Sequence, residues 1–290
     1  MRITFSWDIG CFCNFKCEYC FFTQSGWENM EKLQGKPRSP EEIDTAWKYI
    51  FGKYGEFMLY ITGGEPFLYP GFVEIVKSLS KYSFLHITTN LSYPVNDLLK
   101  AVSPERVSFN CTYHPRYMEI DRFIRRIIDV RKEGFICDVC YLAHPGQLRE
   151  MLSYKKYFRA SGIDMALTVF WGNHRGIEYP KGYTEGQKLY YRYTAEWAPE
   201  QSDRNLVVTG REKIEEQIND LDPGLSLDKM CKAGYNYATV KVNGDILRCG
   251  QLSGPLLGNI FRHDLEMLER ETKCRVDYCR SREIEYTEGE

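Results

Sequence analysis

Strand-like and helix-like segments alternate over the first 170 residues, and this alternation constrains the fold more than any other feature. Residues 40–51 illustrate the helical pattern, because Ser39 and Glu42 form a capping-box sequence around Pro40, and Ile43 and Trp47 then lie on one helical face. The predicted strands are 2–9, 56–62, 84–89, 106–113, 135–142 and 164–171, and the helices between them include 40–51, 72–79, 119–133 and 147–160. Six consecutive strand–helix units predict a parallel α/β sheet with right-handed crossovers.

The length of this region favours an open sheet over a closed barrel. A complete eight-stranded barrel needs roughly 250 residues, whereas the repeats occupy about 170. We therefore expect a partial (β/α)6 TIM-like barrel at residues 1–175, with the chemistry carried by loops at the carboxyl ends of the strands. A connecting segment is expected at 176–228, with helices near 185–196 and 211–221. A small α+β domain is expected at 229–290.

Composition and charge exclude several broad classes of function. The 38 Lys and Arg residues nearly balance the 40 Asp and Glu residues, which argues against a nucleic-acid binder that works by phosphate neutralisation. The sequence is 43% hydrophobic, enough to fill a core. No run approaches the ~18 apolar residues of a membrane span, and no signal peptide is apparent. We expect a cytoplasmic protein that binds neither nucleic acid nor membrane.

The eleven cysteines are too many for a chain without an export signal to hold as disulfides, and eight of them cluster near the ends. Cys13, Cys17 and Cys20 have the spacing C-x3-C-x2-C, directly after the first strand. Three thiolates suit a [4Fe–4S] cluster with one iron left open. A zinc site that uses Cys11 as a fourth ligand is the alternative, although this spacing is uncommon for zinc.

This cysteine spacing, with the aromatic Tyr19 before the last cysteine, resembles the radical S-adenosylmethionine (SAM) superfamily. The sequence Thr62-Gly63-Gly64-Glu65-Pro66 at the end of the second strand resembles the GGEP motif of the same family. Turn glycines beside structural thiols are the alternative explanation. The resemblance implies a SAM-binding [4Fe–4S] cluster whose electron cleaves SAM to methionine and a 5′-deoxyadenosyl radical, which then removes a hydrogen atom from the substrate.

The resemblance also implies roles for individual residues. Tyr19 matches an aromatic residue near the adenine, and Gly63, Gly64, Glu65 and Pro66 match the site of the SAM amino group. Further SAM contacts are expected from Thr88 and Asn90 after the third strand and from Ser108 and Asn110 on the fourth. The match after the third strand is partial, because Leu91 stands where glycine is usual. Ser108 and Asn110 are also explained as simple inward-facing polar residues.

A second group of cysteines begins at Cys231. The spacing Cys231-x12-Gly244-x4-Cys249 resembles the SPASM/Twitch extension of radical SAM enzymes, and Asn243-Gly244-Asp245 predicts a hairpin turn within it. With Cys274 and Cys279, the resemblance implies a Twitch-like domain with a second, auxiliary [4Fe–4S] cluster. The spacing of the last two cysteines is unusual, which leaves the fourth ligand open, and a zinc ribbon is the alternative.

Three residues on the fourth and fifth strands are candidates for the reaction itself. Cys140 shares a strand face with Asp138, so that its thiol could return a hydrogen atom to a substrate radical. His114 could act as an acid or a base, and Asp138 could pair with a substrate amine or hydroxyl. A buried apolar thiol and a solvated loop histidine are the alternatives for Cys140 and His114.

The expected substrate is a small polar metabolite, such as a sugar or an aminocyclitol, which is oxidised or epimerised. The expectation follows from the absence of a peptide-recognition segment before the first strand and from the compact barrel-plus-Twitch organisation. Modification of a ribosomally made peptide is the alternative, and a non-catalytic iron–sulfur scaffold is a third possibility that the GGEP sequence disfavours. Flavodoxin or ferredoxin is the reductant that the family implies.

Overall fold

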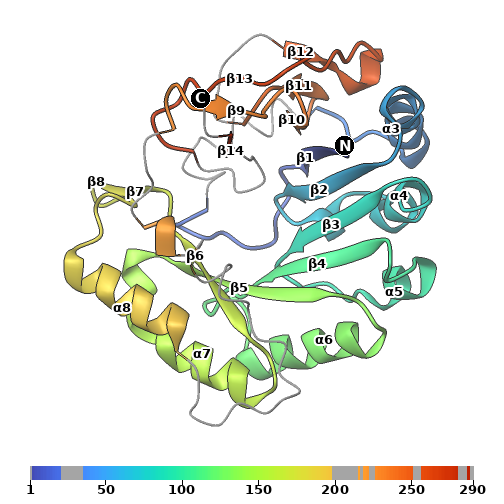
Figure 1. Ribbon diagram of the computed structural model, residues 1–290. Coiled ribbons are helices and arrows are strands. Elements are labelled where there is room, and N and C mark those ends of the chain that lie inside the picture. The colour runs from blue at the N-terminus through green and yellow to red at the C-terminus, as the bar shows by residue number, and fades with distance from the viewer. Residues whose placement is uncertain are drawn as a thin grey trace.

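The computed structural model describes residues 2–20, 35–197, 215, 218–221, 226–250, 256–279 and 286–287. Its centre is a nine-stranded sheet in the order β12-β11-β10-β1-β2-β3-β4-β5-β6. The strands from β1 to β6 are parallel and follow chain order, and Figure 1 shows the helices covering one side of this curved sheet. The predicted α/β fold with a partial parallel barrel is confirmed.

The six predicted strands and the principal helices are present. The strands are β1 (Ile3–Gly10), β2 (Phe57–Gly63), β3 (Phe84–Thr89), β4 (Val107–Thr112), β5 (Cys137–Ala143) and β6 (Met165–Val169). The helices are α3 (Pro40–Tyr54), α4 (Phe72–Leu79), α5 (Asn96–Ala101), α6 (Ile120–Lys132), α7 (Met151–Ala160) and α8 (Glu185–Glu196), with 3-10 turns η1 (Pro66–Leu68), η2 (Pro145–Glu150) and η3 (Ile260–Arg262). Of the predicted helix at 211–221, most lies outside the described residues.

Helix α3 begins where its sequence predicts. The Ser39 hydroxyl accepts a hydrogen bond from the Glu42 backbone N–H, and the Glu42 carboxylate accepts one from the Ser39 N–H at 2.8 Å. Trp47 on the buried face meets Phe5 of β1 edge to face, with ring centroids 5.5 Å apart. The cap and the buried face together attach α3 to the sheet.

The C-terminal part of the chain adds to the same sheet. Strand β10 (Tyr237–Val240) pairs in parallel with β1, and β11 (Asp245–Leu247) and β12 (Leu256–Asn259) continue the sheet antiparallel. Gly244, with φ 87°, forms the predicted turn between β10 and β11. Figure 1 shows these strands beside β1. The sheet therefore has three more strands than the six predicted, because a distant segment completes its open edge.

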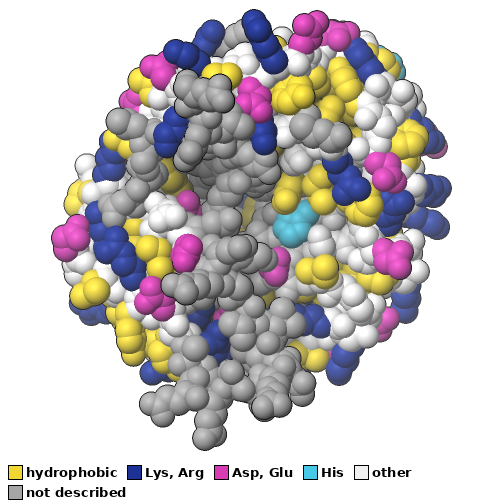
Figure 2. Space-filling view, in the orientation of Figure 1, with side chains coloured by type: hydrophobic (Ala, Val, Ile, Leu, Met, Phe, Trp, Pro, Cys, Tyr) yellow, Lys and Arg dark blue, Asp and Glu magenta, His cyan; other side chains and the backbone are white. Residues whose placement is uncertain are grey.

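Two small sheets complete the described structure. Strands β7 (Gly172–His174) and β8 (Ile177–Tyr179) form a hairpin, and β9 (Met230–Cys231) lies between β13 (Thr272–Lys273) and β14 (Tyr286–Thr287). None of the described helices is both long and apolar enough to cross a membrane. On the face in Figure 2, side chains of both charges are interspersed, in keeping with the near-zero net charge.

The two faces of the sheet differ in polarity. Along β1, Phe5, Trp7 and Ile9 are buried on the helix-covered face, whereas Ser6 and Asp8 lie on the opposite, concave face. The same alternation continues along β2 to β6, since successive side chains of a strand point to opposite faces. The apolar face forms the core, and the polar face lines a cavity.

Candidate active site

A cavity of about 810 Å³ lies on the concave side of the sheet, toward the carboxyl ends of its strands. Its lining includes the three cysteines of the first loop, the two glycines at the end of β2, and inward-facing residues of β1, β3–β6 and β10. The principal lining residues are Ser6, Asp8, Cys13, Cys17, Tyr19, Cys20, Thr62, Gly63, Gly64, Thr88, Asn90, Asn110, Thr112, His114, Cys140, Thr168, Thr239 and Lys241. Ligand cavities of α/β sheets characteristically occupy this position.

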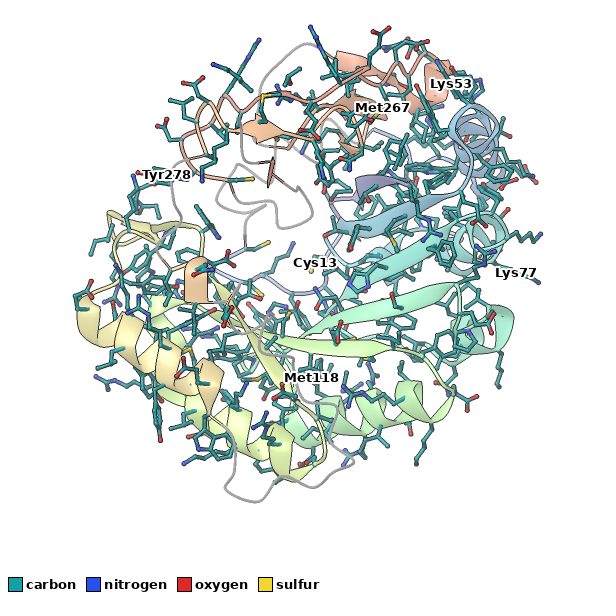
Figure 3. All side chains as sticks on the ribbon, viewed as in Figure 1. Cys13, Lys53, Lys77, Met118, Met267 and Tyr278 are labelled. Carbon is teal, nitrogen blue, oxygen red and sulfur yellow. The ribbon has the colours of Figure 1, made fainter. Side chains whose placement is uncertain are left out.

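The cysteine loop suits an iron–sulfur cluster. Cys13, Cys17 and Cys20 all line the cavity, and Figure 3 shows Cys13 in the interior of the molecule. The Phe15 backbone N–H points at the Cys13 sulfur at 3.4 Å. Burial raises the pKa of Cys17 to about 12, so its proton must be displaced on metal binding. Soft sulfur donors at the edge of an open cavity fit a cluster that leaves one iron accessible.

Gly63 and Gly64 bring the two loops of the site into direct backbone contact. The Gly64 N–H donates to the Gly10 carbonyl at 2.8 Å, and the Glu65 N–H donates to the Phe12 carbonyl at 2.6 Å. A Cβ atom on Gly64 would lie 2.5 Å from the Phe12 carbonyl carbon, and Gly63 has a φ of 126°. Both positions therefore require glycine, and the loop after β2 packs against the loop that holds the cysteines.

Glu65 connects this loop to the end of β3. Its side chain accepts hydrogen bonds from the Thr89 hydroxyl at 2.8 Å, the Asn90 N–H at 2.7 Å and the Phe67 N–H at 3.3 Å. Glu65 is 2% exposed, and burial raises its pKa to about 7. Both carboxylate oxygens thus bind the protein itself, so the predicted contact of this carboxylate with SAM stays a prediction. Pro66, also buried, begins η1.

Replacing Glu65 by alanine is expected to lower the free energy of unfolding by about 1–3 kcal/mol at pH 7.5, because buried donors lose their acceptor. The loss should grow as the pH falls toward 6. The pKa is higher in the folded protein than the usual 4.5, so the wild type gains stability as the carboxyl is protonated, and the variant does not. Anaerobic urea unfolding at both pH values measures this. Glu41→Ala, at an exposed position of α3, is the control, and an equal loss in both variants would contradict the role of Glu65.

Tyr19 and His114 form one buried contact beside Cys17. The Tyr19 hydroxyl lies 3.0 Å from His114 Nδ1, and the two rings stack with centroids 5.9 Å apart. The Cys17 sulfur lies 3.6 Å from the same nitrogen. Burial lowers the pKa of His114 to about 4, so the imidazole is neutral at physiological pH. Both residues line the cavity, and His114 faces the cysteine loop rather than bulk solvent.

The predicted SAM-contacting residues of β3 and β4 divide into two groups. Thr88, Asn90 and Asn110 line the cavity. Ser108 is not among the lining residues, and its hydroxyl lies 2.8 Å from His86 Nδ1. Three of these four residues therefore line the same cavity as Cys13, Cys17 and Cys20.

The two candidates on β5 are also separated. Cys140 lines the cavity, and its sulfur lies 3.2 Å from the Thr112 hydroxyl on β4. Asp138 shares the face of Cys140, as predicted, but it is exposed at the start of the strand and is not among the lining residues. Asp138 thus lies outside the cavity, whereas Cys140 lies within it.

Sequence reasoning missed the contribution of β1 and β10 to the cavity. Ser6 and Asp8 come from β1, Thr239 from β10, and Lys241 directly follows β10. Lys241 Nζ donates to Asp8 Oδ2 at 3.3 Å. The polar residues at alternate positions of β1 were a visible signal, but the pairing of β1 with a strand more than 200 residues away was not.

The second set of cysteines also meets in space. Cys231, Cys249 and Cys274 belong to one buried cluster, and Cys279 packs against it. The Arg248 guanidinium donates to the carbonyls of Ala233, Thr272 and Lys273 and so ties together the segments that carry these thiols. In the described part of the chain, no three His, Cys, Asp or Glu side chains converge on one point as ligands of a single metal ion do.

The sequence is similar to curated proteins over less than a third of its length. It is 42% identical over 84 residues to the GTP 3′,8-cyclase of Microcystis aeruginosa, a match that covers 27% of this chain and 24% of that protein. The GTP 3′,8-cyclase of Crocosphaera subtropica is 36% identical over 87 residues, covering 30% and 24% of the two chains. The matches thus span about a quarter of the length of these curated relatives.

The fold is similar to solved structures along most of the chain. Native anSMEcpe with bound AdoMet has a TM-score of 0.62 at 15% identity, covering 89% of this chain and 78% of that chain. Streptococcus suis SuiB bound to its precursor peptide SuiA has a TM-score of 0.59 at 15% identity, covering 91% and 63%. At this identity the likeness concerns the fold.

The match to a family profile and the residues of the cavity together indicate the family of this chain. The sequence profile of the Radical SAM superfamily matches residues 7–152, which is half of the chain. The matched region includes the cysteine loop and the paired glycines that the cavity brings together. The family implies a [4Fe–4S] cluster and SAM as cofactors, and the donor set fits both. The chain therefore belongs to the radical SAM superfamily.

Proposed function

We propose that this protein cleaves SAM reductively and removes a hydrogen atom from a small polar metabolite with hydroxyl groups, such as a sugar or an aminocyclitol. The observation that carries the proposal is the combination of three cysteines, two backbone-paired glycines and a wall of polar side chains around one cavity. The cavity of about 810 Å³ must hold SAM as well as the substrate, which favours a small substrate. Flavodoxin or ferredoxin in the cytoplasm would supply the electrons.

The residues of the site have distinct tasks in this proposal. Cys13, Cys17 and Cys20 would hold the cluster, and the backbone at Gly63 and Gly64 would bind the methionine part of SAM. When bound, the cluster and SAM supply the one-electron chemistry that ends in hydrogen-atom removal. The cavity walls orient the substrate and exclude water during this step.

The proposal allows two reactions, epimerisation and oxidation, and only epimerisation requires the Cys140 thiol. Its thiol lines the cavity beside the Thr112 hydroxyl and has a hydrogen atom to give to a substrate radical. In an epimerisation the Cys140 S–H hydrogen is given to the substrate radical from the opposite face, and the thiyl radical that remains regains the thiol with one electron from the flavodoxin or ferredoxin and one proton from solvent. In an oxidation the substrate radical instead loses a proton, its electron would pass to the auxiliary cluster, and the thiol is not needed.

The anaerobically reconstituted enzyme, given SAM and dithionite, is expected to form 5′-deoxyadenosine. Cys140→Ala is expected to do so at a rate within about twofold, because this thiol is not among the predicted ligands of the cluster. With myo-inositol and D-glucose in D2O, mass spectrometry measures deuterium in the sugar. An epimerase loses this incorporation in Cys140→Ala but keeps it in Cys111→Ala, whose thiol is buried on the opposite face of β4. Absence of 5′-deoxyadenosine from the wild type would contradict the proposed function.

We propose that Cys231, Cys249, Cys274 and Cys279 hold an auxiliary [4Fe–4S] cluster in a Twitch-like domain at 229–290. The packing of these four side chains in one group supports the proposal. The hydrogen bonds from Arg248 to the Ala233 and Thr272 carbonyls also support it, because they join the segments that carry the cysteines. In a cube each thiolate binds a different iron, so the sulfurs need not converge on one point as around zinc.

Metal analysis of the reconstituted protein tests the auxiliary cluster. We expect about eight irons per chain, four from each cluster. Cys231→Ala should lower this to about four while SAM cleavage at the first cluster continues. About four irons with one zinc in the wild type would overturn the assignment and favour a zinc ribbon.

Modification of a peptide is the second candidate function. The fold similarity to SuiB, whose structure is bound to a precursor peptide, favours it. A peptide substrate would leave 5′-deoxyadenosine formation unchanged, so the two candidates are separated by which compound acquires deuterium or loses hydrogen.

A further inference from the structure

An ion pair lies on the wall of the cavity where β1 meets β10. Lys241 Nζ donates to Asp8 Oδ2 at 3.3 Å, and both residues line the cavity. Asp8 is 8% exposed, and 29% of the Lys241 side chain is exposed. Burial raises the pKa of Asp8, and Lys241 opposes the shift. The pair joins the barrel to the C-terminal part of the chain directly beside the cavity.

Hydroxyl groups surround this pair. Ser6 of β1 is the register partner of Thr239 of β10, and each precedes a member of the pair by two residues on the same face. Thr62 is the register partner of Asp8 across β2 and also lines the cavity. This part of the wall is therefore a continuous hydrogen-bonding surface, in contrast to the apolar face behind it.

The pair has hydrogen-bonding capacity beyond its own contact. A carboxylate can accept about four hydrogen bonds and an ammonium can donate three. Within the described residues, one hydrogen bond of 3.3 Å joins the two groups. Removing two charges from water is unfavourable, and one contact of 3.3 Å compensates for it poorly. A ligand that engages both groups would satisfy the remaining donors and acceptors.

We propose that Asp8 and Lys241 form a subsite that binds hydroxyl groups of a neutral polyol substrate, an assignment that rests on the proposed function. A hydroxyl donates a hydrogen bond to Asp8 and accepts one from Lys241, so it engages both groups at once. The pair carries no net charge, so it gives a net anionic or cationic group no advantage over a neutral hydroxyl. Gly250 also lines the cavity beside the pair, since a Cβ atom built there would lie 3.5 Å from Thr239 Oγ1 and 3.9 Å from Lys241 Nζ.

A second ion pair in the same molecule serves as a control for a purely structural role of the Asp8–Lys241 pair. Lys53 of α3 bonds to the Glu266 carboxylate and so also joins the barrel to the C-terminal part of the chain. Its side chain is likewise 29% exposed, but it does not line the cavity. Figure 3 shows Lys53 near Met267 at the outer edge, whereas Cys13 lies in the interior. Lys53→Met therefore removes a similar bridge without touching the subsite.

Calorimetric titration of the anaerobic holoenzyme with SAM tests the subsite. The probes are myo-inositol and D-glucose, cyclohexanol as a ring with one hydroxyl, and tetra-alanine as a peptide. We expect the wild type to bind at least one polyol more tightly than cyclohexanol or tetra-alanine. Asp8→Asn and Lys241→Met should each raise its Kd at least about tenfold, and Lys53→Met should leave it within about twofold.

Formation of 5′-deoxyadenosine without substrate distinguishes the possible failures. Lys53→Met should retain it, and iron analysis shows whether Asp8→Asn and Lys241→Met fold and hold the clusters. If Asp8→Asn keeps the iron content of the wild type while its polyol binding is unchanged, the subsite is wrong although the proposed function stands. A wild type that binds no polyol, or only tetra-alanine, likewise overturns the subsite. A wild type that forms no 5′-deoxyadenosine overturns the proposed function itself.

Discussion

Replacing Cys17 by alanine is expected to abolish 5′-deoxyadenosine formation and to lower the iron content of the reconstituted protein by about four per chain. Cys17 lies between the other two thiols of its loop and lines the same cavity. With one of three ligands removed, the cluster would have two irons without protein ligands instead of one. Iron analysis and chromatography of the reaction mixture measure both effects.

Cys11→Ala is the matched control, since it removes a thiol from the same loop. Cys11 is 0% exposed and is not among the residues that line the cavity. Its loss should leave the iron content unchanged and 5′-deoxyadenosine formation within about twofold of the wild type. If Cys11→Ala lost iron and Cys17→Ala did not, the predicted ligand set would be wrong.

The parts of the fold that sequence predicts best are those determined by local signals. The cap of α3 was visible in Ser39 and Glu42, and the structure shows the reciprocal bonds that their spacing implies. The strand predicted at residues 2–9 is present as β1, and its apolar and polar residues alternate between the buried face and the cavity face. By contrast, β10 is four residues long, and its pairing with β1 depends on the closure of the whole chain. No local pattern encodes that register.

The same distinction applies to the site. Cys13 and Gly64 belong to contiguous sequence motifs. Both were predicted to follow the end of a strand, and both do. Asp8 and Lys241 are each an ordinary charged residue in sequence, and they acquire a common environment only when β10 pairs with β1. Glu65 shows a further limit, because its motif gave no sign that its carboxylate would bind the end of β3.

Gly64→Ala is expected to destabilise the site, because the glycine lies directly against the backbone of the cysteine loop. The new Cβ atom would lie 2.5 Å from the Phe12 carbonyl carbon and 2.8 Å from the Cys11 oxygen. The loops cannot separate without breaking the bond from the Glu65 N–H to the Phe12 carbonyl. We expect a loss of roughly 2–4 kcal/mol in unfolding free energy, and iron incorporation at the first cluster should fall with it.

Iron incorporation should fall because Phe12 lies between Cys11 and Cys13, so a displacement of the Phe12 backbone moves Cys13. Gly186→Ala is the control, because Gly186 lies in α8 and a Cβ atom there meets nothing within 4 Å. Alanine should stabilise this helix by up to about 1 kcal/mol and leave iron incorporation unchanged. Anaerobic urea unfolding and iron analysis of both variants measure the contrast. If Gly64→Ala kept the iron content and stability of the wild type, the contact between the two loops would not position the cysteines.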